Sequence, residues 1–198
     1  MTSTDMGELS DEELVELVRR ADRSDLRAFD ALVRRYQDRV TTNCRHISGS
    51  PNDAEDLTQE VLVKAYFGIP RFEGRSRFST WIQRIKVNHC LNFLKKKKGQ
   101  TFLDVDEPAA MGEEALHVEA DAERNLHRLD ERQIISEVLS SLSDTVRIPL
   151  VMRDMDGFSY QEIAEELGIG LSAAKMRIKR GREEFRLTYR SLTGWEAT

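Results

Sequence analysis

Residues 158–185, FSYQEIAEELGIGLSAAKMRIKRGREEF, predict two helices joined by a tight turn. Ser159 and Glu162 form a capping box, which marks the start of the first helix. Gly168 is the residue type that a left-handed turn favours after that helix. Apolar or small residues then recur at helical spacing on both sides of the turn, so the stretch predicts a helix-turn-helix. These positions are Ile163, Ala164, Leu167, Ala174, Ile178, Gly181 and Phe185.

The outer face of the second helix is polar and basic, which predicts contact with DNA. A helix of this kind fits the major groove, with its first residues at base edges and later basic residues at phosphates. The alternative is a solvated basic helix in an ordinary bundle. The coincidence of cap, turn and basic face favours DNA binding. The candidate contacts are Ser172, Ala173, Lys175, Met176, Lys179, Arg180 and Arg182.

A second basic stretch, RFEGRSRFSTWIQRIKVNHCLNFLKKKK, covers residues 71–98 and contains one acid, Glu73. Aromatic residues interleaved with arginines suit unstacked bases and the phosphates between them. Asn88 and Asn92 are four residues apart on one helical face, where their amides can hydrogen-bond to base edges. Packing in a core is the stronger interpretation of Trp81, and base recognition is favoured for the asparagines. The candidate residues are Arg75, Arg77, Trp81, Arg84, Asn88, Asn92, Lys95 and Lys96.

The segment DAEDLTQEVLVKAY, residues 53–66, predicts an amphipathic helix with an acidic face. Asp53, Asp56 and Gln59 lie opposite its apolar stripe. Such a face repels DNA and would suit a basic protein surface. Taken alone, the pattern favours a solvated face.

The whole chain indicates a helical protein in two parts. Apolar residues recur at helical spacing almost throughout, and no stretch shows sustained strand-like alternation. Residues 101–131 contain ten acids and two arginines and have weak periodicity. We therefore predict an all-α fold of two small helical domains, residues 10–98 and 131–195, joined by a flexible acidic linker, 99–130. Within it, Ser79 is expected to cap a helix and Pro149 to bend or interrupt one.

The composition indicates in which cellular compartment the protein resides, and the motifs argue against catalysis. The 198 residues carry a net charge of -5, and no apolar run approaches the roughly 20 residues that cross a bilayer. The acidic N-terminus does not resemble a signal peptide, and two cysteines cannot form a disulfide framework, so we predict a cytoplasmic protein without membrane insertion. Cys44, His46, His89 and Cys90 lack a familiar zinc spacing. Because no phosphate loop, nucleophile elbow or HExxH motif is present, we expect no enzyme activity, metal, cofactor or small-molecule substrate.

In this order, the motifs resemble those of the extracytoplasmic-function sigma factors over about residues 10–190. AFDALVRRYQDRV, residues 28–40, resembles the opening helix of their second conserved region. Residues 53–66 resemble the helix that grips the clamp of the largest polymerase subunit, and residues 71–96 resemble the segment that melts and recognises the minus-ten element. Residues 139–186 resemble the fourth region, which recognises the minus-thirty-five element. The Asn88 and Asn92 pair is most similar to the envelope-stress branch.

The resemblance implies specific partners. Core RNA polymerase would be bound through its clamp, by Asp53, Asp56 and Gln59, and through its flap. Promoter DNA would be recognised at the minus-ten strand by Asn88 and Asn92, with a flipped-out base held by the loop at 73–77. The acidic linker would thread toward the RNA exit path. An anti-sigma factor would control the protein in a stress- or signal-responsive regulon.

One segment departs from the family pattern. The recognition helix of such proteins usually begins Gly-Thr-Val-Lys-Ser-Arg, whereas residues 172–177 are Ser-Ala-Ala-Lys-Met-Arg. Two polar groups near the bases are thus replaced by Ala173 and Met176, for which contact with thymine methyls is one substitute. The alternative function is a stand-alone helix-turn-helix regulator. It would share residues 158–185 but would have no use for the acidic helix or for residues 71–98.

Overall fold

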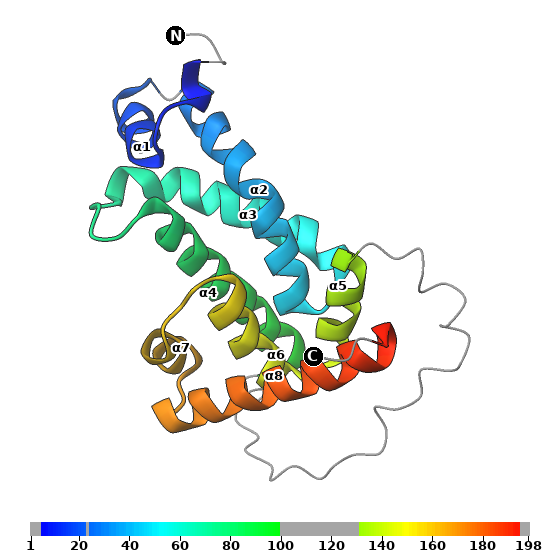
Figure 1. Cartoon of the computed structure of the whole chain (residues 1–198). Helices are drawn as coiled ribbons and strands as arrows, with labels where there is room; N and C mark the ends of the chain where they lie inside the picture. The colour runs from blue at the N-terminus through cyan, green and yellow to red at the C-terminus, as the bar shows by residue number, and fades with distance from the viewer. Residues whose placement is uncertain (1–4, 23, 100–130, 195–198) are drawn as a thin grey trace. The chain divides into compact units, whose positions relative to one another are not determined.

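The computed structural model describes residues 5–22, 24–99 and 131–194, and every regular element in these ranges is a helix (Figure 1). The predicted all-α fold is confirmed. The chain divides into two compact units, residues 1–94 and 95–198, so the division falls in the last turn of the helix that carries Asn88. Apart from Gly99, the predicted linker lies outside the described residues, as does the path expected for it.

Among the residues of the first unit that the structure describes, there are four α-helices and two short 3-10 turns. They are η1 (Asp5–Gly7), α1 (Asp11–Arg20), α2 (Arg27–Ser48), α3 (Pro51–Gly68), η2 (Ile69–Arg71) and α4 (Phe78–Lys98), the last extending past the division. The second unit contains α5 (Glu131–Ser141), α6 (Asp144–Leu150), η6 (Val151–Met155), α7 (Tyr160–Leu167) and α8 (Leu171–Thr193).

Helix starts follow the chemistry of capping. The Ser50 hydroxyl accepts a bond from the Asp53 amide, with Pro51 in the first turn of α3. The capping box predicted at Ser159 is present, with bonds of 2.8 and 3.2 Å to and from Glu162. The cap predicted at Ser79 is wrong. Helix α4 begins one residue earlier, because the Arg77 carbonyl already accepts bonds from the amides of residues 80 and 81.

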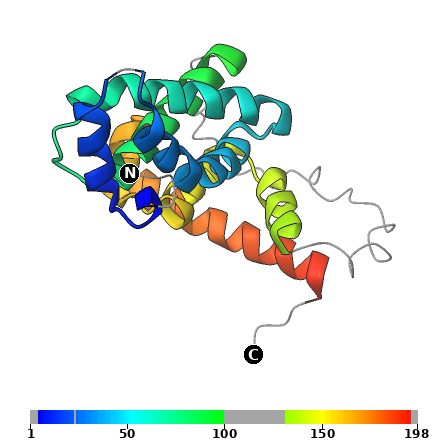
Figure 2. The ribbon, with the colours of Figure 1, turned by 90° about the horizontal axis from the view of Figure 1, so that it is seen from above.

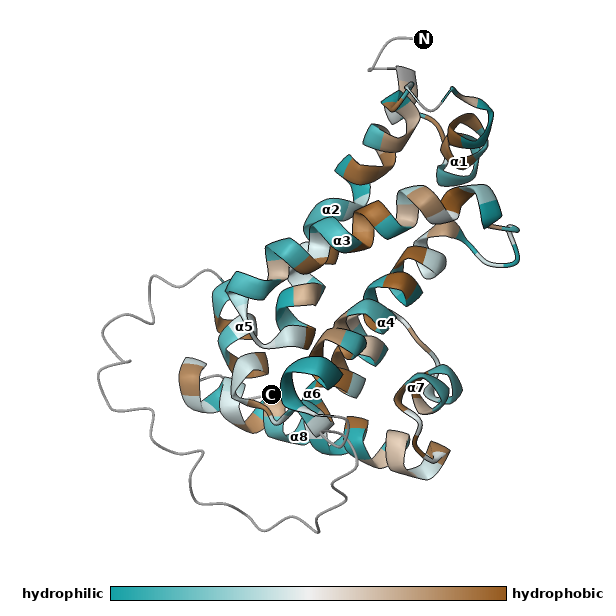
Figure 3. Cartoon of the chain, turned by 180° about the vertical axis from the view of Figure 1, so that it is seen from behind, coloured by the Kyte–Doolittle hydropathy of each residue, from teal (hydrophilic) through white to brown (hydrophobic). Residues whose placement is uncertain are grey.

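The core of the first unit lies between α2, α3 and α4. Helices α2 and α3 pack against each other (Figure 2), and both alternate hydrophobic with hydrophilic residues along their length (Figure 3). The thiols of Cys44 on α2 and Cys90 on α4 are fully buried, with their sulfurs 3.6 Å apart. This contact fixes the middle of α4 against α2, and it leaves the opposite side of α4 to solvent.

The N-terminal segment is tied to α2 by a polar cluster. The Tyr36 hydroxyl donates a hydrogen bond to the Asp11 carboxylate, and Arg35 bonds to the same carboxylate at 2.9 Å. Arg35 also donates to the backbone carbonyls of Gly7 and Leu9. Burial of the Tyr36 ring, reinforced by the bond to Asp11, raises the pKa of its hydroxyl. Helix α1 is therefore fixed to α2 by a set of bonds, of which the one from Tyr36 requires a neutral hydroxyl.

In the second unit, the backbone changes where Pro149 was expected to interrupt a helix. Pro149 has no N–H, so it cannot donate the α-helical bond to the carbonyl of residue 145. The α-helix α6 ends at Leu150, and a wider π-helical turn, η6, follows. In that turn the Asp156 amide donates to the Val151 carbonyl at 3.1 Å.

The helix-turn-helix is present as predicted. Helix α7 ends at Leu167 and is capped by Gly168, whose φ of 68° is the left-handed conformation expected there. Ala174 and Ile178 on α8 are buried in the core of the second unit. Phe185, predicted to be buried with them, is only partly covered and stacks on Tyr189.

Candidate functional site

One face of α4 presents the polar residues predicted to meet the minus-ten element. Arg84, Asn88, Asn92 and Lys95 recur every three or four residues and are exposed, while Val87, which lies between them in sequence, is buried. The exposed candidates are Arg75, Arg77, Arg84, Asn88, Asn92, Lys95 and Lys96. Lys86 is not part of this face, because it is fully buried and its ammonium donates to Gln83 at 2.7 Å.

The aromatic residues next to this face are packing residues. Phe72 and Phe78 are buried, so stacking of bases on their rings is not supported. Trp81 is partly exposed, with its ring centroid 5.0 Å from that of Phe72 and 5.6 Å from that of Phe78. Its ring also lies over Gly68, where an added Cβ would come within 2.9 Å of it. This packing agrees with the core interpretation of Trp81, although the residue stays partly exposed.

The loop before α4 carries two exposed arginines. Gly74 has a φ of 70°, which turns the chain between Phe72 and the start of α4. Arg75 forms an ion pair with Glu73 at 2.6 Å, and both side chains are largely exposed. Arg77 stands at the end of the loop and is also exposed. The loop therefore offers cations beside the exposed face of α4.

Helix α3 carries a mixed acidic and apolar face, which we call the α3 face. It consists of Asp56, Gln59, Glu60, Val63 and Phe67, all exposed and spaced by three or four residues. Asp53, the third predicted contact, is half-buried in the first turn of the helix.

Sequence reasoning missed two members of the α3 face. Phe67 is 70% exposed and Val63 is 54% exposed, although both are large and apolar. The signal was available in the sequence, because both fall outside the stripe of Leu57, Val61 and Ala65 that is buried. Isolated apolar residues at a protein surface are common, but two of them on one acidic helical face indicate a protein-binding surface.

The first half of α8 presents the residues predicted to meet the minus-thirty-five element. Ser172, Lys175, Met176 and Lys179 are exposed, and Ala173 is half-buried. Both predicted arginines are held by carboxylates. Arg180 bonds to Glu184 at 2.6 Å, and Arg182 bonds to Asp154 at 2.6 and 2.9 Å. The hydrogen bonds that Arg182 donates to the Asp154 carboxylate raise the pKa of Arg182, so this guanidinium stays charged and directed toward η6.

Comparisons with known proteins match both halves of the chain. Residues 32–100 match the family model Sigma-70 region 2, and residues 132–185 match Sigma-70, region 4. The chain is 32% identical to the ECF RNA polymerase sigma factor SigW of Bacillus subtilis (strain 168), over 88% of this chain and 96% of that protein. It is 34% identical to the ECF RNA polymerase sigma-E factor of Escherichia coli (strain K12), over 89% of this chain and 92% of the relative. The chain belongs to the ECF sigma factors.

A solved structure agrees with this fold. The sigma factor RpoE, in complex with the anti-sigma factor NepR from Bartonella quintana, matches with a TM-score of 0.56 at 23% identity. The match covers 82% of this chain and 96% of that one. Sigma factors are non-enzymatic initiation factors that bind core RNA polymerase and direct it to promoters. The predicted function is therefore confirmed at this level, and the alternative of a stand-alone regulator is not needed.

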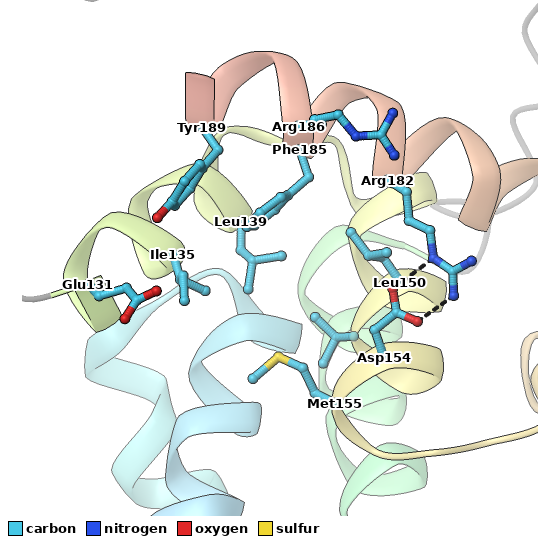
Figure 4. A pocket seen from close by; sticks show the side chains of 11 residues that line it. Glu131, Ile135, Leu139, Leu150, Asp154, Met155, Arg182, Phe185, Arg186 and Tyr189 are labelled. Carbon is cyan, nitrogen blue, oxygen red and sulfur yellow. Dashed lines mark hydrogen bonds and ion pairs between the residues drawn. The ribbon is translucent and has the colours of Figure 1, made fainter. Parts of the chain in front are cut away.

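The second unit of this sigma factor also contains an apolar groove between α5, α6 with η6, and the second half of α8 (Figure 4). Its volume is about 590 Å³. Arg182 and Asp154 form an ion pair at one rim, and Glu131 lies at the other end. The apolar wall is formed by Ile135, Leu139, Leu150, Val151, Met155, Phe185 and Tyr189.

Within residues 5–22, 24–99 and 131–194, no group of three or more His, Cys, Asp or Glu side chains is placed to hold a metal ion. In the same ranges, no helix has both the length and the apolar character needed to span a bilayer.

Proposed function

We propose that the α3 face is the surface by which this sigma factor binds the clamp of the largest polymerase subunit. The observation that carries the proposal is the exposure of Phe67 and Val63 beside Asp56 and Gln59. Protein interfaces combine apolar anchors that become buried with charged residues at the rim, which give the encounter its specificity. The acids of α3 exclude DNA as the partner of this face, because phosphates would be repelled.

The exposed face of α4 contacts the minus-ten element. Asn88 and Asn92 provide amides that donate and accept hydrogen bonds, as recognition of unpaired bases requires. The lysines at the end of α4 and the arginines at 75 and 77 neutralise phosphates on either side. The loop at 73–77 holds a base flipped out of the strand.

The first half of α8 contacts the minus-thirty-five element in the major groove. Exposed Ser172, Lys175 and Lys179 supply the polar and basic contacts. The groove of the second unit uses residues 182–189 of α8, beyond this segment. We assign it to the flap of the polymerase, since an apolar groove on the second half of α8 leaves the first half available to DNA.

An anti-sigma factor controls the activity. The expectation comes from the family resemblance, and the solved relative RpoE was captured with its anti-sigma factor NepR. Control by masking requires a surface that polymerase also uses. The α3 face is such a surface, because its exposed phenylalanine and valine would be covered by either partner.

The test of clamp binding compares matched variants in reconstitution with bacterial core RNA polymerase. The double variant Asp56→Ala, Gln59→Ala removes one acid and one amide from the α3 face, and Phe67→Ala removes the exposed ring. We expect each to weaken core binding about 30-fold, as loss of an interface hot spot does. Asp53 is left intact, because its carboxylate in the first turn also stabilises α3.

The controls have the same chemistry at other exposed positions. Gln37→Ala with Asp38→Ala removes an amide and an acid from α2, and Leu26→Ala removes an apolar side chain that is 44% exposed. Both should bind core within about twofold of wild type. Wild-type binding by the α3 variants, with promoter-specific transcription retained, would show that the clamp is bound elsewhere.

A further inference from the structure

The first two turns of α8 combine exposed basic residues with one exposed methionine. Met176 is 68% exposed, between Lys175 and Lys179, which are also exposed. Its neighbours Ala174 and Ile178 are buried, so Met176 is not part of the core of the second unit. The thioether therefore belongs to the surface that we assign to DNA, and the core does not explain its presence there.

The chemistry of Met176 restricts what it can recognise. A thioether has no hydrogen to donate and accepts only weakly, so it cannot bind the polar edges of guanine, adenine or cytosine. Phosphates, which are bound by cations and N–H donors, gain nothing from it. In the major groove, the 5-methyl group of thymine is the apolar feature that distinguishes one base from the others.

The position of Met176 agrees with contact to bases. It lies in the second turn of the helix that follows the turn at Gly168, and the first turns of a recognition helix approach base edges. Ala173, one turn earlier and half-buried, adds little bulk, which allows the helix to approach closely. Leu187 is comparably exposed, but it lies eleven residues further along, about 16 Å by helix rise.

We infer that Met176 selects a thymine in the minus-thirty-five element through contact with its 5-methyl group. The inference rests on the proposed role of α8 in binding that element. Lys175 and Lys179 supply affinity through phosphates, and Met176 supplies preference at one base pair. Flexibility of the methionine side chain lets it adapt to the methyl group without a fixed hydrogen-bond geometry.

The test removes only the methyl group. Holoenzyme reconstituted from the full chain is used to enrich promoters from a library randomised at the minus-thirty-five element. Each thymine of the enriched element is then replaced, one at a time, by deoxyuridine. For wild type, we expect one replacement to weaken promoter binding about fourfold, which is the worth of one buried methyl-sized group. For Met176→Ala, thymine and deoxyuridine at that position should bind equally, and Leu187→Ala should retain the wild-type difference.

The outcomes separate the inference from the function on which it rests. If wild type binds every deoxyuridine promoter as well as its thymine counterpart, the inference is wrong, whereas the role of α8 stands. An enriched element without thymine would also overturn the inference. If Lys175→Ala and Lys179→Ala leave binding to the enriched element unchanged, α8 does not contact this element. The inference about Met176 and the proposed role of α8 are then both wrong. In that case, Met176 would belong to a protein-binding surface.

Discussion

Gly181 of α8 lies against the backbone carbonyl of Val146 in α6. An added Cβ at Gly181 would come within 3.0 Å of that oxygen and 3.4 Å of Leu150 Cβ. Neither neighbour is the flexible end of a side chain, so the two helices would have to separate. The close approach depends on glycine, and it fixes α8, with the residues that we assign to DNA, against α6.

Gly181→Ala should therefore destabilise the second unit by about 1–3 kcal/mol, as overpacking of a core does. In a helix without close neighbours, replacing glycine by alanine would stabilise the helix by about 1 kcal/mol. The sign of the change in stability therefore shows whether the close approach at Gly181 is present. Hydrogen exchange of α8 amides in the full chain reports on this unit separately from the first. Glu183→Ala, at an exposed position on the same helix, should change exchange little, and slower exchange in Gly181→Ala would contradict the prediction.

The contact between Cys44 and Cys90 predicts low thiol reactivity. Both side chains are fully buried, so a thiol reagent reaches them only when the first unit opens. We expect labelling in native buffer to be at least about a thousandfold slower than in urea, as for groups protected by a stable domain. Ser172→Cys places a thiol at an exposed position and serves as the fast control. Rapid labelling of the wild-type protein in native buffer would show that α2 and α4 separate readily.

The sequence allowed prediction of the elements whose determinants are local. The helix-turn-helix was found from a capping box, one glycine and a 3.6-residue period, each of which acts within a few residues. The helical period of apolar residues identifies which residues share a face of a helix. It does not show how far along that face a neighbouring helix covers them. Leu26 has the helical spacing of the apolar residues of α2, yet it lies just before that helix and is 44% exposed.

Contacts between distant segments could not be predicted in this way. Arg182 is paired with Asp154, which lies 28 residues away in the π-helical turn η6. Lys86 contributes to the positive charge of residues 71–98 but is buried, because α4 is covered on that side. The distribution of charge along the sequence therefore indicates where exposed basic residues gather. Which of these residues are buried or paired could be assigned only from the packed structure.

The bond between Tyr36 and Asp11 predicts loss of stability at high pH. The pKa of Tyr36 is raised in the folded state by burial and by this bond, so the folded state favours the neutral hydroxyl. The contribution to the free energy of unfolding is complete below about pH 10, the pKa of an unfolded tyrosine, and is lost as pH rises above it. Urea unfolding followed by circular dichroism across this range measures the loss. Above about pH 10, Tyr36→Phe should lose less free energy of unfolding than wild type does. Tyr66→Phe, in the same unit, should lose as much as wild type. Equal losses in wild type and Tyr36→Phe would show that ionisation of Tyr36 is not the cause.

Asn88 and Asn92 are exposed one turn apart on α4, so each should contribute separately to recognition of the minus-ten element. An amide that makes two good hydrogen bonds to a base gives about 1–3 kcal/mol of discrimination. We therefore expect Asn88→Ala and Asn92→Ala each to reduce transcription from the preferred promoter by about 10-fold or more. Each should also relax base preference at a different position of the element, measured by transcription from a randomised library. Asn52→Ala, at an exposed position in the first turn of α3, should match wild type. Because neither substitution touches the α3 face, core binding should be unchanged, and a loss of core binding would assign α4 to the polymerase.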